Sequence, residues 1–169
     1  FYEFNKIMQA PFSSFLKLGN KYILSASPER FLRKNKNHIL SQPIKGTIKR
    51  GAEVLQDNYL INELKLSQKD ISENIMITDL VRNDLSITAK KESVKVDELC
   101  RVYTFKKVHQ MITSISSEID KDVSFTDVLK ATFPMGSMTG APKVRAMEII
   151  EFFENFKRGF FSGSVGYIL

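Results

Sequence analysis

The sequence contains a single cysteine, Cys100, among its 169 residues. One cysteine cannot form a disulfide within the chain, so a disulfide-stapled scaffold is excluded and a reducing compartment is expected. No apolar run approaches the roughly 20 residues that span a bilayer. The first ten residues lack both a basic head and a small-residue cleavage site, so nothing resembles a secretory signal. These absences predict a cytoplasmic protein with no membrane role.

Signatures of nucleic-acid binding are also absent, although the chain is basic. The net charge is +6, and part of the excess lies in two clusters. The clusters comprise Arg33, Lys34, Lys36, Lys90, Lys91 and Lys95. Because no RNP, zinc-finger or helix-turn-helix pattern accompanies them, we predict no nucleic-acid partner. The clusters are then solvated loops that favour an anionic small molecule.

Repeats, low-complexity tracts and linkers are missing as well. A chain of this length buries roughly 70% of its extended surface on folding. With 43% hydrophobic residues and thirteen phenylalanines, it has enough apolar side chains for a real core. One ordinary domain is therefore predicted.

Alternating apolar residues predict the strands. The expected strands cover residues 12–18, 21–27, 38–42, 93–96, 108–119 and 162–169. The first two form a hairpin around Gly19-Asn20, and Lys45 is expected where the third gives way to a glycine turn. The last strand is expected to be buried, with no turn or cap after it.

Helical spacing predicts the helices. Residues 52–85 read as two helices divided near Ser67. The run that begins at Ser124 resembles a capping box, and its helix should stop at Pro134. A last helix should begin near Pro142 and continue through Phe153.

Lys45 and Glu29 offer an amine and a carboxylate sixteen positions apart. An amine attacks carbon only when it is neutral, and the free pKa of lysine is roughly 10.4. A catalytic Lys45 would therefore need a desolvated pocket or a nearby positive charge. On residue type alone, the alternative is a solvated lysine in a Pro/Gly turn.

Carboxylates fall on one stripe of the second predicted helix, at Asp70, Glu73 and Asp84, with Arg82 on the far side. Such a stripe can hold a hard cation such as Mg²⁺, which takes one or two protein carboxylates. It can equally be a wet helix face.

Polar groups also gather near the start of the last helix. The hydroxyls of Ser137 and Thr139, the charge of Lys143 and the backbone N–H groups near Pro142 could hold a carboxylate. The alternative is an ordinary helix-start loop. His109 begins an apolar strand, where a lone histidine is either a packed residue or a catalyst.

Four runs together resemble the chorismate-utilising enzymes, a family that includes anthranilate synthase component I and aminodeoxychorismate synthase component I. They are Ser-Pro-Glu-Arg-Phe at 27–31, Pro-Ile-Lys-Gly-Thr at 43–47, Glu-Asn-Ile-Met-Ile-Thr-Asp-Leu-Val-Arg-Asn-Asp-Leu at 73–85, and Phe-Pro-Met-Gly-Ser-Met-Thr-Gly-Ala-Pro-Lys-Val-Arg-Ala-Met-Glu at 133–148. The match runs in order from about Ala10 to Leu169. The resemblance implies an α+β fold of mainly antiparallel β-sheets with flanking helices.

Lys45 selects a branch of this family. Members of the anthranilate and isochorismate type usually carry Ala at this position, whereas aminodeoxychorismate synthases carry Lys. The resemblance thus implies amination of chorismate at C4 to 4-amino-4-deoxychorismate, in the para-aminobenzoate branch of folate biosynthesis. By the same resemblance, Lys45 attacks C2 and Glu29 protonates the hydroxyl that leaves C4. Ammonia then enters at C4 and releases the lysine.

The resemblance also implies a cofactor, a partner and further site residues. The cofactor is Mg²⁺ held by Glu73, and the partner is a glutamine amidotransferase subunit that supplies ammonia. Substrate-binding positions are implied at Arg82, His109, Ser137, Thr139 and Gly140.

Segments that the family usually has are missing from the sequence at both ends, including one that carries a second metal-binding glutamate. Residues 1–169 are therefore expected to be the central portion of a chorismate-binding catalytic domain. Two alternatives stay open. One is an enzyme like anthranilate synthase component I, and the other is a non-catalytic fragment or remnant of the domain.

Overall fold

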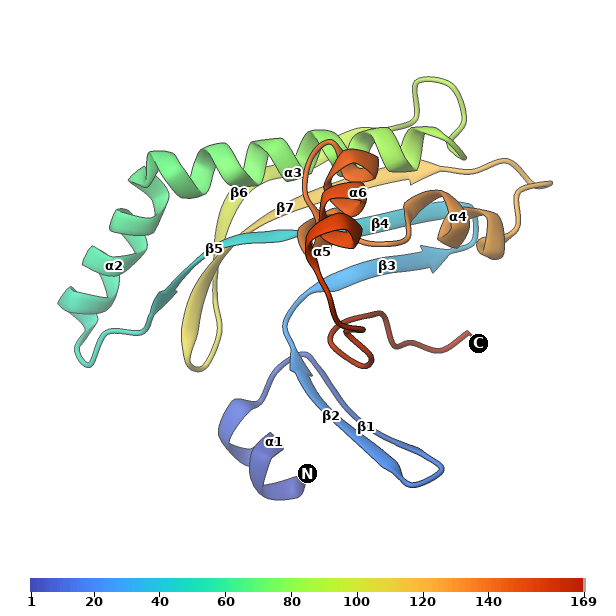
Figure 1. Ribbon diagram of the computed structural model, residues 1–169. Coiled ribbons are helices and arrows are strands. Elements are labelled where there is room, and N and C mark those ends of the chain that lie inside the picture. The colour runs from blue at the N-terminus through green and yellow to red at the C-terminus, as the bar shows by residue number, and fades with distance from the viewer. Residues whose placement is uncertain (169) are drawn as a thin grey trace.

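A five-stranded antiparallel sheet forms the centre of the fold (Figure 1). The computed structural model describes residues 1–168 of the chain. The strands run in the order β3-β4-β7-β5, and β6 also pairs with β7. Their bounds are β3 Arg30–Asn35, β4 His38–Gln42, β5 Ile44–Lys49, β6 Lys95–Thr104 and β7 Val108–Glu118.

The long strand β7 organises this sheet. It pairs with β4 through residues 115–118 and with β5 through residues 108–112, so these two short strands follow one another along it. Most β7 side chains are buried, on both faces of the sheet. The strand predicted at 108–119 is thus confirmed, with its last ladder residue at Glu118.

The strand predicted at 93–96 was placed too early and made too short. β6 begins at Lys95 and continues to Thr104. Two register shifts interrupt its pairing with β7, and Cys100 adopts a positive φ of 50°. These irregularities break the period-two alternation, so the sequence pattern concealed most of the strand.

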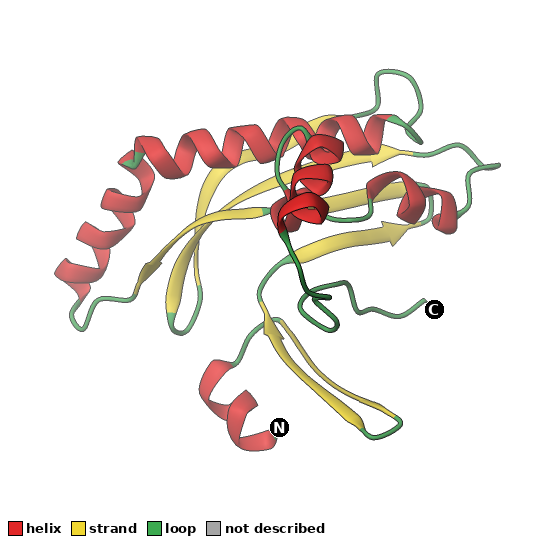
Figure 2. Cartoon of the chain, in the orientation of Figure 1, coloured by secondary structure: helices red, strands yellow, loops and turns green. Residues whose placement is uncertain are grey.

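The predicted hairpin is confirmed as a separate two-stranded sheet. β1, Phe12–Leu18, pairs with β2, Lys21–Ser27, around the turn at Gly19, whose φ is 59°. Figure 2 shows this hairpin and the preceding helix α1, Tyr2–Met8, standing below the main sheet. α1 was not foreseen from the sequence.

The remaining helices lie mainly along one side of the main sheet (Figure 1). Their bounds are α2 Val54–Leu66, α3 Gln68–Ser86, α4 Phe125–Thr132, α5 Gly136–Thr139 and α6 Lys143–Phe153. The core cluster joins α3, α4 and the sheet through Ile39, Leu85, Ile115, Ile119 and Val128. Full burial of each such side chain stabilises the fold by roughly 1.5–3 kcal/mol.

Two helix boundaries lie where the sequence predicted them. α2 ends and α3 begins around Ser67, whose hydroxyl accepts the N–H of Asp70. Ser124 and Asp127 form the capping box that opens α4. α4 ends at Thr132, just before the Phe133-Pro134 step, because proline cannot continue the ladder.

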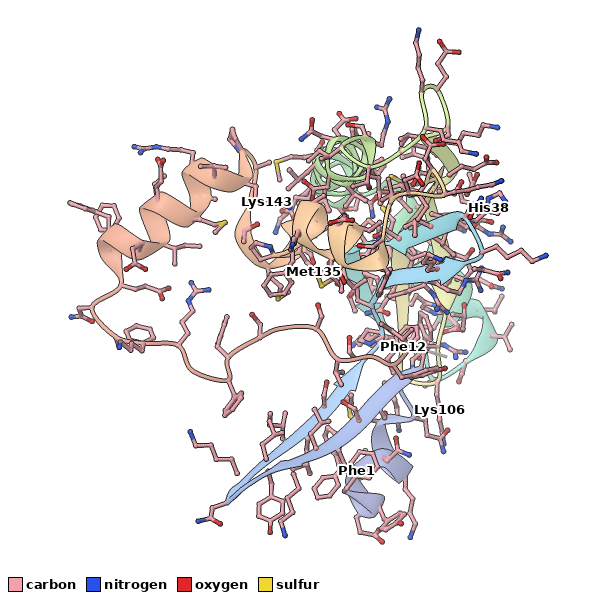
Figure 3. All side chains as sticks on the ribbon, turned by 90° about the vertical axis from the view of Figure 1, so that its right-hand side faces the viewer. Phe1, Phe12, His38, Lys106, Met135 and Lys143 are labelled. Atoms are coloured by element: carbon pink, nitrogen blue, oxygen red, sulfur yellow. The ribbon has the colours of Figure 1, made fainter. Side chains whose placement is uncertain are left out.

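α6 was also predicted correctly, but the strand predicted after it is wrong. None of residues 143–153, all of them described, is buried, and Figure 3 shows this helix projecting away from the sheet. Residues 162–168 are exposed and irregular, and Leu169 lies outside the described residues. A strand needs a partner for its backbone groups, and no described strand lies beside this segment to provide one.

Among residues 1–168, the structure contains no helix that combines the length and the apolarity needed to cross a membrane.

Candidate functional site

Lys45 lies inside a strand rather than in the turn that the sequence predicted. The chain resumes extended structure after Pro43, and Gly46 does not end β5. Ile44 pairs with Ile112 and Thr47 pairs with Gln110, so β5 advances three residues while β7 advances two. The extra residue is a β-bulge at Lys45-Gly46, and a bulge re-aims side chains that a regular strand would alternate.

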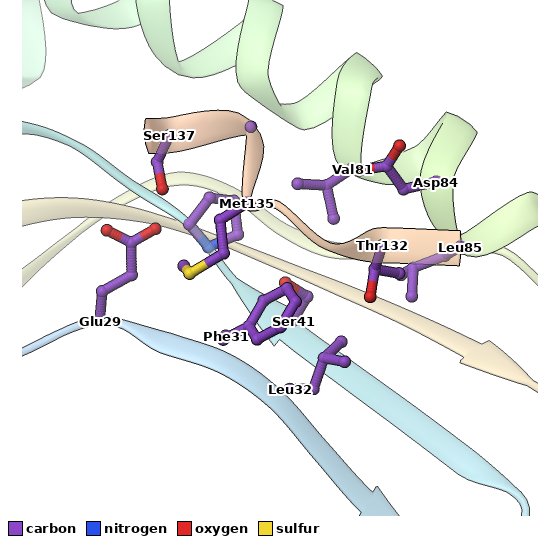
Figure 4. Close-up of a pocket in the computed structure, with 12 residues that line it drawn as sticks. Glu29, Phe31, Leu32, Ser41, Val81, Asp84, Leu85, Thr132, Met135 and Ser137 are labelled. Atoms are coloured by element: carbon purple, nitrogen blue, oxygen red, sulfur yellow. The ribbon is translucent and has the colours of Figure 1, made fainter. Parts of the chain in front are cut away.

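Lys45, Glu29 and Ser137 are brought together from three separate segments. Lys45 Nζ lies 3.5 Å from the main-chain oxygen of Ser137, to which it donates. Glu29 stands just before β3, and Figure 4 shows its carboxyl group and the Ser137 hydroxyl pointing toward one another. The predicted pair of amine and carboxylate therefore meets in space, with α5 above it.

Burial raises the pKa of Glu29 above its ordinary value. The Ser137 side chain, the Lys45 charge and the Ile44 backbone oppose this rise without cancelling it. Glu29 Oε1 and Ser137 Oγ are buried and have no hydrogen-bond partner among the described residues. A carboxyl group in this state retains its proton to higher pH than a solvated one, so it is suited to donate that proton.

A small cavity of about 20 Å³ adjoins Glu29 and Ser137. Its walls include the apolar side chains of Phe31, Val81 and Leu85 (Figure 4). A single water requires roughly 10–15 Å³, so the enclosed space is about the size of one water. These apolar side chains lie beside Glu29, whose burial raises its pKa.

The carboxylate stripe predicted on α3 is divided between three different environments. Asp70 is hydrogen-bonded to the Ser67 hydroxyl at the helix start. Asp84 is buried, whereas Glu73 is 44% exposed and lies 4.0 Å from Lys69. Neither a three-carboxylate cation site nor a uniformly wet face describes this arrangement, because the side chains meet different neighbours.

Glu73 remains available as a metal ligand. No group of three or more His, Cys, Asp or Glu side chains able to hold a metal gathers within residues 1–168. Mg²⁺ nevertheless needs only one or two protein carboxylates, because it keeps several waters and binds substrate oxygens. The half-exposed carboxylate of Glu73 can supply one such ligand.

Lys143 does not serve the carboxylate-binding role that the sequence suggested for it. Its Nζ lies 2.5 Å from Asp84 Oδ2 and donates to the Thr132 carbonyl oxygen at 3.0 Å. Burial raises the pKa of Asp84, and the Lys143 charge opposes that rise. The lysine is occupied by a largely buried ion pair that joins the start of α6 to α3.

Thr139 and Gly140 shape the loop rather than extend the cluster. Thr139 Oγ1 donates to the Met135 carbonyl oxygen at 3.3 Å, within the turn of α5. Gly140 has a φ of 140°, and a Cβ there would lie 3.2 Å from the Cβ of Ala146. Of the three positions predicted on this segment, only Ser137 contacts the amine.

His109 is completely buried on the α2 side of the sheet. Its Nε2 is 2.8 Å from Asp57 Oδ1, and its Nδ1 is 2.9 Å from Thr104 Oγ1. Asp57 also accepts from the Arg50 guanidinium, which holds the pKa of that carboxyl far below its ordinary value. These contacts correspond to the packed-residue alternative, and they do not bring His109 to Lys45.

Arg82 points outward from α3. Its Nη1 donates to Asp79 Oδ1 at 2.9 Å, and its side chain is 52% exposed. The far-side placement expected from helical geometry is confirmed. The described contacts do not join Arg82 to the cluster of Glu29, Lys45 and Ser137.

Asn74 was missed from the sequence, although its amide donates to the Lys45 carbonyl oxygen at 3.2 Å. It is 1% exposed and lies on the sheet-facing side of α3. The available signal was a polar residue at a position where helical spacing calls for an apolar one.

The sequence is similar to those of several other proteins. The family model described as chorismate binding enzyme matches residues 1–169. Aminodeoxychorismate synthase component 1 of Salmonella typhimurium is 46% identical over 168 residues, which make up 99% of this chain and 37% of that protein. Anthranilate synthase component 1 of Aquifex aeolicus is 40% identical over 159 residues, 94% of this chain and 32% of that protein.

A solved structure shows the same fold. Anthranilate synthase component I from Streptococcus pneumoniae superposes with a TM-score of 0.85 at 29% identity, over 98% of this chain and 36% of that one. The predicted α+β class, with antiparallel sheets and helices, is confirmed. The chain spans 37% of the length of the Salmonella protein, so it corresponds to part of these relatives. The protein belongs to the chorismate binding enzyme family.

Proposed function

We propose that the protein aminates chorismate at C4, giving 4-amino-4-deoxychorismate, with Lys45 as a covalent nucleophile. The observation that carries this proposal is the meeting of Lys45, Glu29 and Ser137 at the β5 bulge. The similarity to aminodeoxychorismate synthase component 1 of Salmonella typhimurium supports the choice of product.

Lys45 supplies the attacking nitrogen in the first step. Once it has lost its proton, the Lys45 amine forms a bond to C2 of chorismate while the ring double bonds shift and the C4–O bond breaks. In the second step ammonia forms a bond to C4, the double bonds shift back, and the bond between Lys45 and C2 breaks. Hydroxide is a poor leaving group, and covalent capture replaces one difficult displacement by two easier ones.

Glu29 supplies the proton for the leaving hydroxyl, which departs as water. The raised pKa of this carboxyl keeps it protonated at a higher pH than a solvated glutamate. Its position near Lys45 lets the carboxylate formed after proton transfer face the cationic nitrogen on the lysine. The Ser137 carbonyl oxygen accepts from the same nitrogen at 3.5 Å.

Glu73 would hold the Mg²⁺ ion, whose chemistry is to neutralise a carboxylate of chorismate. Arg82, His109, Thr139 and Gly140 stay predictions from the family resemblance. We propose a cytoplasmic location, and a glutamine amidotransferase subunit as the source of ammonia.

A second candidate is an activity like that of anthranilate synthase component I. The 40% identity to the Aquifex aeolicus protein favours it. Lys45 discriminates between the two, because members of the anthranilate branch usually carry Ala at this position. A non-catalytic remnant is the third candidate, and calorimetry with chorismate and Mg²⁺ separates it, because a remnant gives no magnesium-dependent binding.

Product analysis tests the proposal. The native protein, Lys45→Ala and Lys49→Ala are each incubated with chorismate, Mg²⁺ and ammonium salt, which removes the need for an amidotransferase. Lys49 is an exposed lysine on the same strand and serves as the matched control. We expect aminodeoxychorismate from the native protein and Lys49→Ala, and none from Lys45→Ala. Unchanged product from Lys45→Ala would refute the nucleophile assignment, and anthranilate from the native protein would favour the second candidate.

A further inference from the structure

The bulge in β5 leaves the backbone around Lys45 without its regular support. Among the described strands, neither Lys45 nor Gly46 has a register partner in β7. Gly46 adopts a φ of 94°, and a Cβ there would approach Asp70 Cβ to 3.0 Å. The direction of the Lys45 side chain therefore depends on contacts, other than strand pairing, that hold this irregular backbone in place.

The side-chain amide of Asn74 spans the two strands at this point. Asn74 Nδ2 donates to the Lys45 carbonyl oxygen at 3.2 Å and to the Met111 carbonyl oxygen at 3.1 Å. Lys45 belongs to β5 and Met111 to β7, so one NH₂ group uses both of its hydrogens to join the strands across the bulge. Because Asn74 is 1% exposed, water does not compete for these contacts.

The orientation of this amide is fixed by Thr113. The Thr113 hydroxyl accepts the Cys100 N–H at 3.0 Å, so it donates its own hydrogen to Asn74 Oδ1, 2.5 Å away. An amide flipped by 180° would set its NH₂ group against this hydroxyl and its oxygen against two carbonyls. Thr78 Oγ1 donates to the main-chain carbonyl oxygen of Asn74 at 2.8 Å and completes the buried network.

We infer that Asn74 is a positioning residue that sets the direction of the Lys45 side chain by clamping the bulge between β5 and β7. Its catalytic consequence rests on the proposed function of Lys45. A carboxylate in place of the amide keeps the shape but presents only acceptors to the two carbonyl oxygens. Asn74→Asp therefore releases the bulge and lets the Lys45 amine move away from Ser137.

The position of Lys45 is measured without substrate, by NMR of protein labelled with ¹³C at the lysine ε-carbons. The Lys45 signal is identified as the one missing from Lys45→Arg. We expect a nuclear Overhauser contact between the Lys45 ε-methylene and Ser137 in the native protein. The contact is lost in Asn74→Asp and kept in Asn62→Asp, which makes the same chemical change at an exposed position on α2. Retention of the contact in Asn74→Asp would overturn the inference.

A second pair of variants covers the case in which Asn74→Asp does not fold. Thr113→Val removes the hydroxyl that fixes the amide, and Thr113→Ser retains it. We expect the Lys45 contact to weaken in the valine variant and to be preserved in the serine variant. Equal spectra for the two variants would contradict the role of the network.

Kinetics connect the position to the reaction. We expect Asn74→Asp to lower kcat by about 100-fold while KM changes little, because a displaced nucleophile affects the chemical step more than binding. If Lys45→Ala stays active, the proposed function fails. The NMR contact still tests the role of Asn74, because it is measured without substrate. If Lys45→Ala is inactive while Asn74→Asp keeps both its kcat and its contact, the inference about Asn74 fails alone.

Discussion

Lys45 Nζ lies 3.5 Å from the main-chain oxygen of Ser137, a contact between residues 92 positions apart. It joins the bulge of β5 to the short helix α5, and Glu29 approaches the same two residues from the start of β3. The arrangement needs all three segments to fold together. The proposed chemistry therefore depends on the sheet and on the segment between α4 and α6.

The stability of the protein should depend on pH through Glu29. Burial raises the folded pKa of this carboxyl above its ordinary value of 4.5. Between these two pKa values the native chain keeps a proton that the unfolded chain has released, so the free energy of unfolding falls as the pH rises through that window. Glu29→Gln cannot ionise and should escape this loss.

We therefore expect Glu29→Gln to gain stability relative to the native protein as the pH rises from about 4 to about 8. Urea unfolding at several pH values measures the difference. A difference that stays constant across this range would contradict the raised pKa.

Gly46→Ala should destabilise the protein more than Gly19→Ala. Both glycines have positive φ, but only at Gly46 would a new methyl group meet a neighbour, Asp70 Cβ at 3.0 Å. We expect a loss of about 3 kcal/mol at Gly46 and about 1 kcal/mol at Gly19. Chemical denaturation of both variants tests this order, and equal losses would show that the bulge tolerates a side chain.

Lys143→Met should leave Asp84 buried without its partner. The two side chains are 13% and 9% exposed, so water cannot replace the lost charge. We expect a loss of about 3 kcal/mol in the free energy of unfolding. The double variant Lys143→Met/Asp84→Asn should recover part of that loss, because it removes the unpaired carboxylate. A single variant as stable as the native protein would argue against the buried pair.

Acid should weaken the contact between α2 and the sheet through Asp57. The Arg50 guanidinium, the Gly51 N–H and His109 hold the folded pKa of this carboxyl below its ordinary value of 3.8. The stability that it contributes is present above pH 3.8 and is lost as the pH falls toward the folded pKa. Asp57→Asn should accordingly be less stable than the native protein near neutral pH. The difference in stability between the two proteins should become smaller in acid.

The matched control for this prediction is Asp79→Asn. Asp79 pairs with Arg82 on the exposed side of α3, and exposed pairs contribute little. Thermal unfolding followed by circular dichroism compares the two variants. A stability difference between Asp57→Asn and the native protein that becomes larger in acid would contradict the expected pH dependence.

The sequence predicted correctly those elements whose structure is determined by residues close to one another in the chain. The Gly19-Asn20 turn, the Ser124 cap and the division at Ser67 depend on neighbouring side chains, and each was found where predicted. The alternation in residues 108–118 likewise reflects a regular strand.

Tertiary contacts decided the rest. β6 was largely concealed because its bulges and the positive φ at Cys100 disturb the alternation. The sequence indicated Lys143 as an anion ligand, but in the structure it binds Asp84, which is 59 positions away. The pair of Lys45 and Glu29 was predicted from the motifs, but Asn74 required the structure. A polar residue inside a helix does not reveal which carbonyl it will meet.

Trapping the covalent intermediate tests the central claim most directly. The protein is mixed with chorismate and Mg²⁺ without ammonia, quenched, and its intact mass and proteolytic peptides are measured. We expect an adduct with the mass of chorismate less water, mapped to Lys45 and absent from Lys45→Ala. An adduct on another residue, or product formed by Lys45→Ala at the native rate, would contradict it.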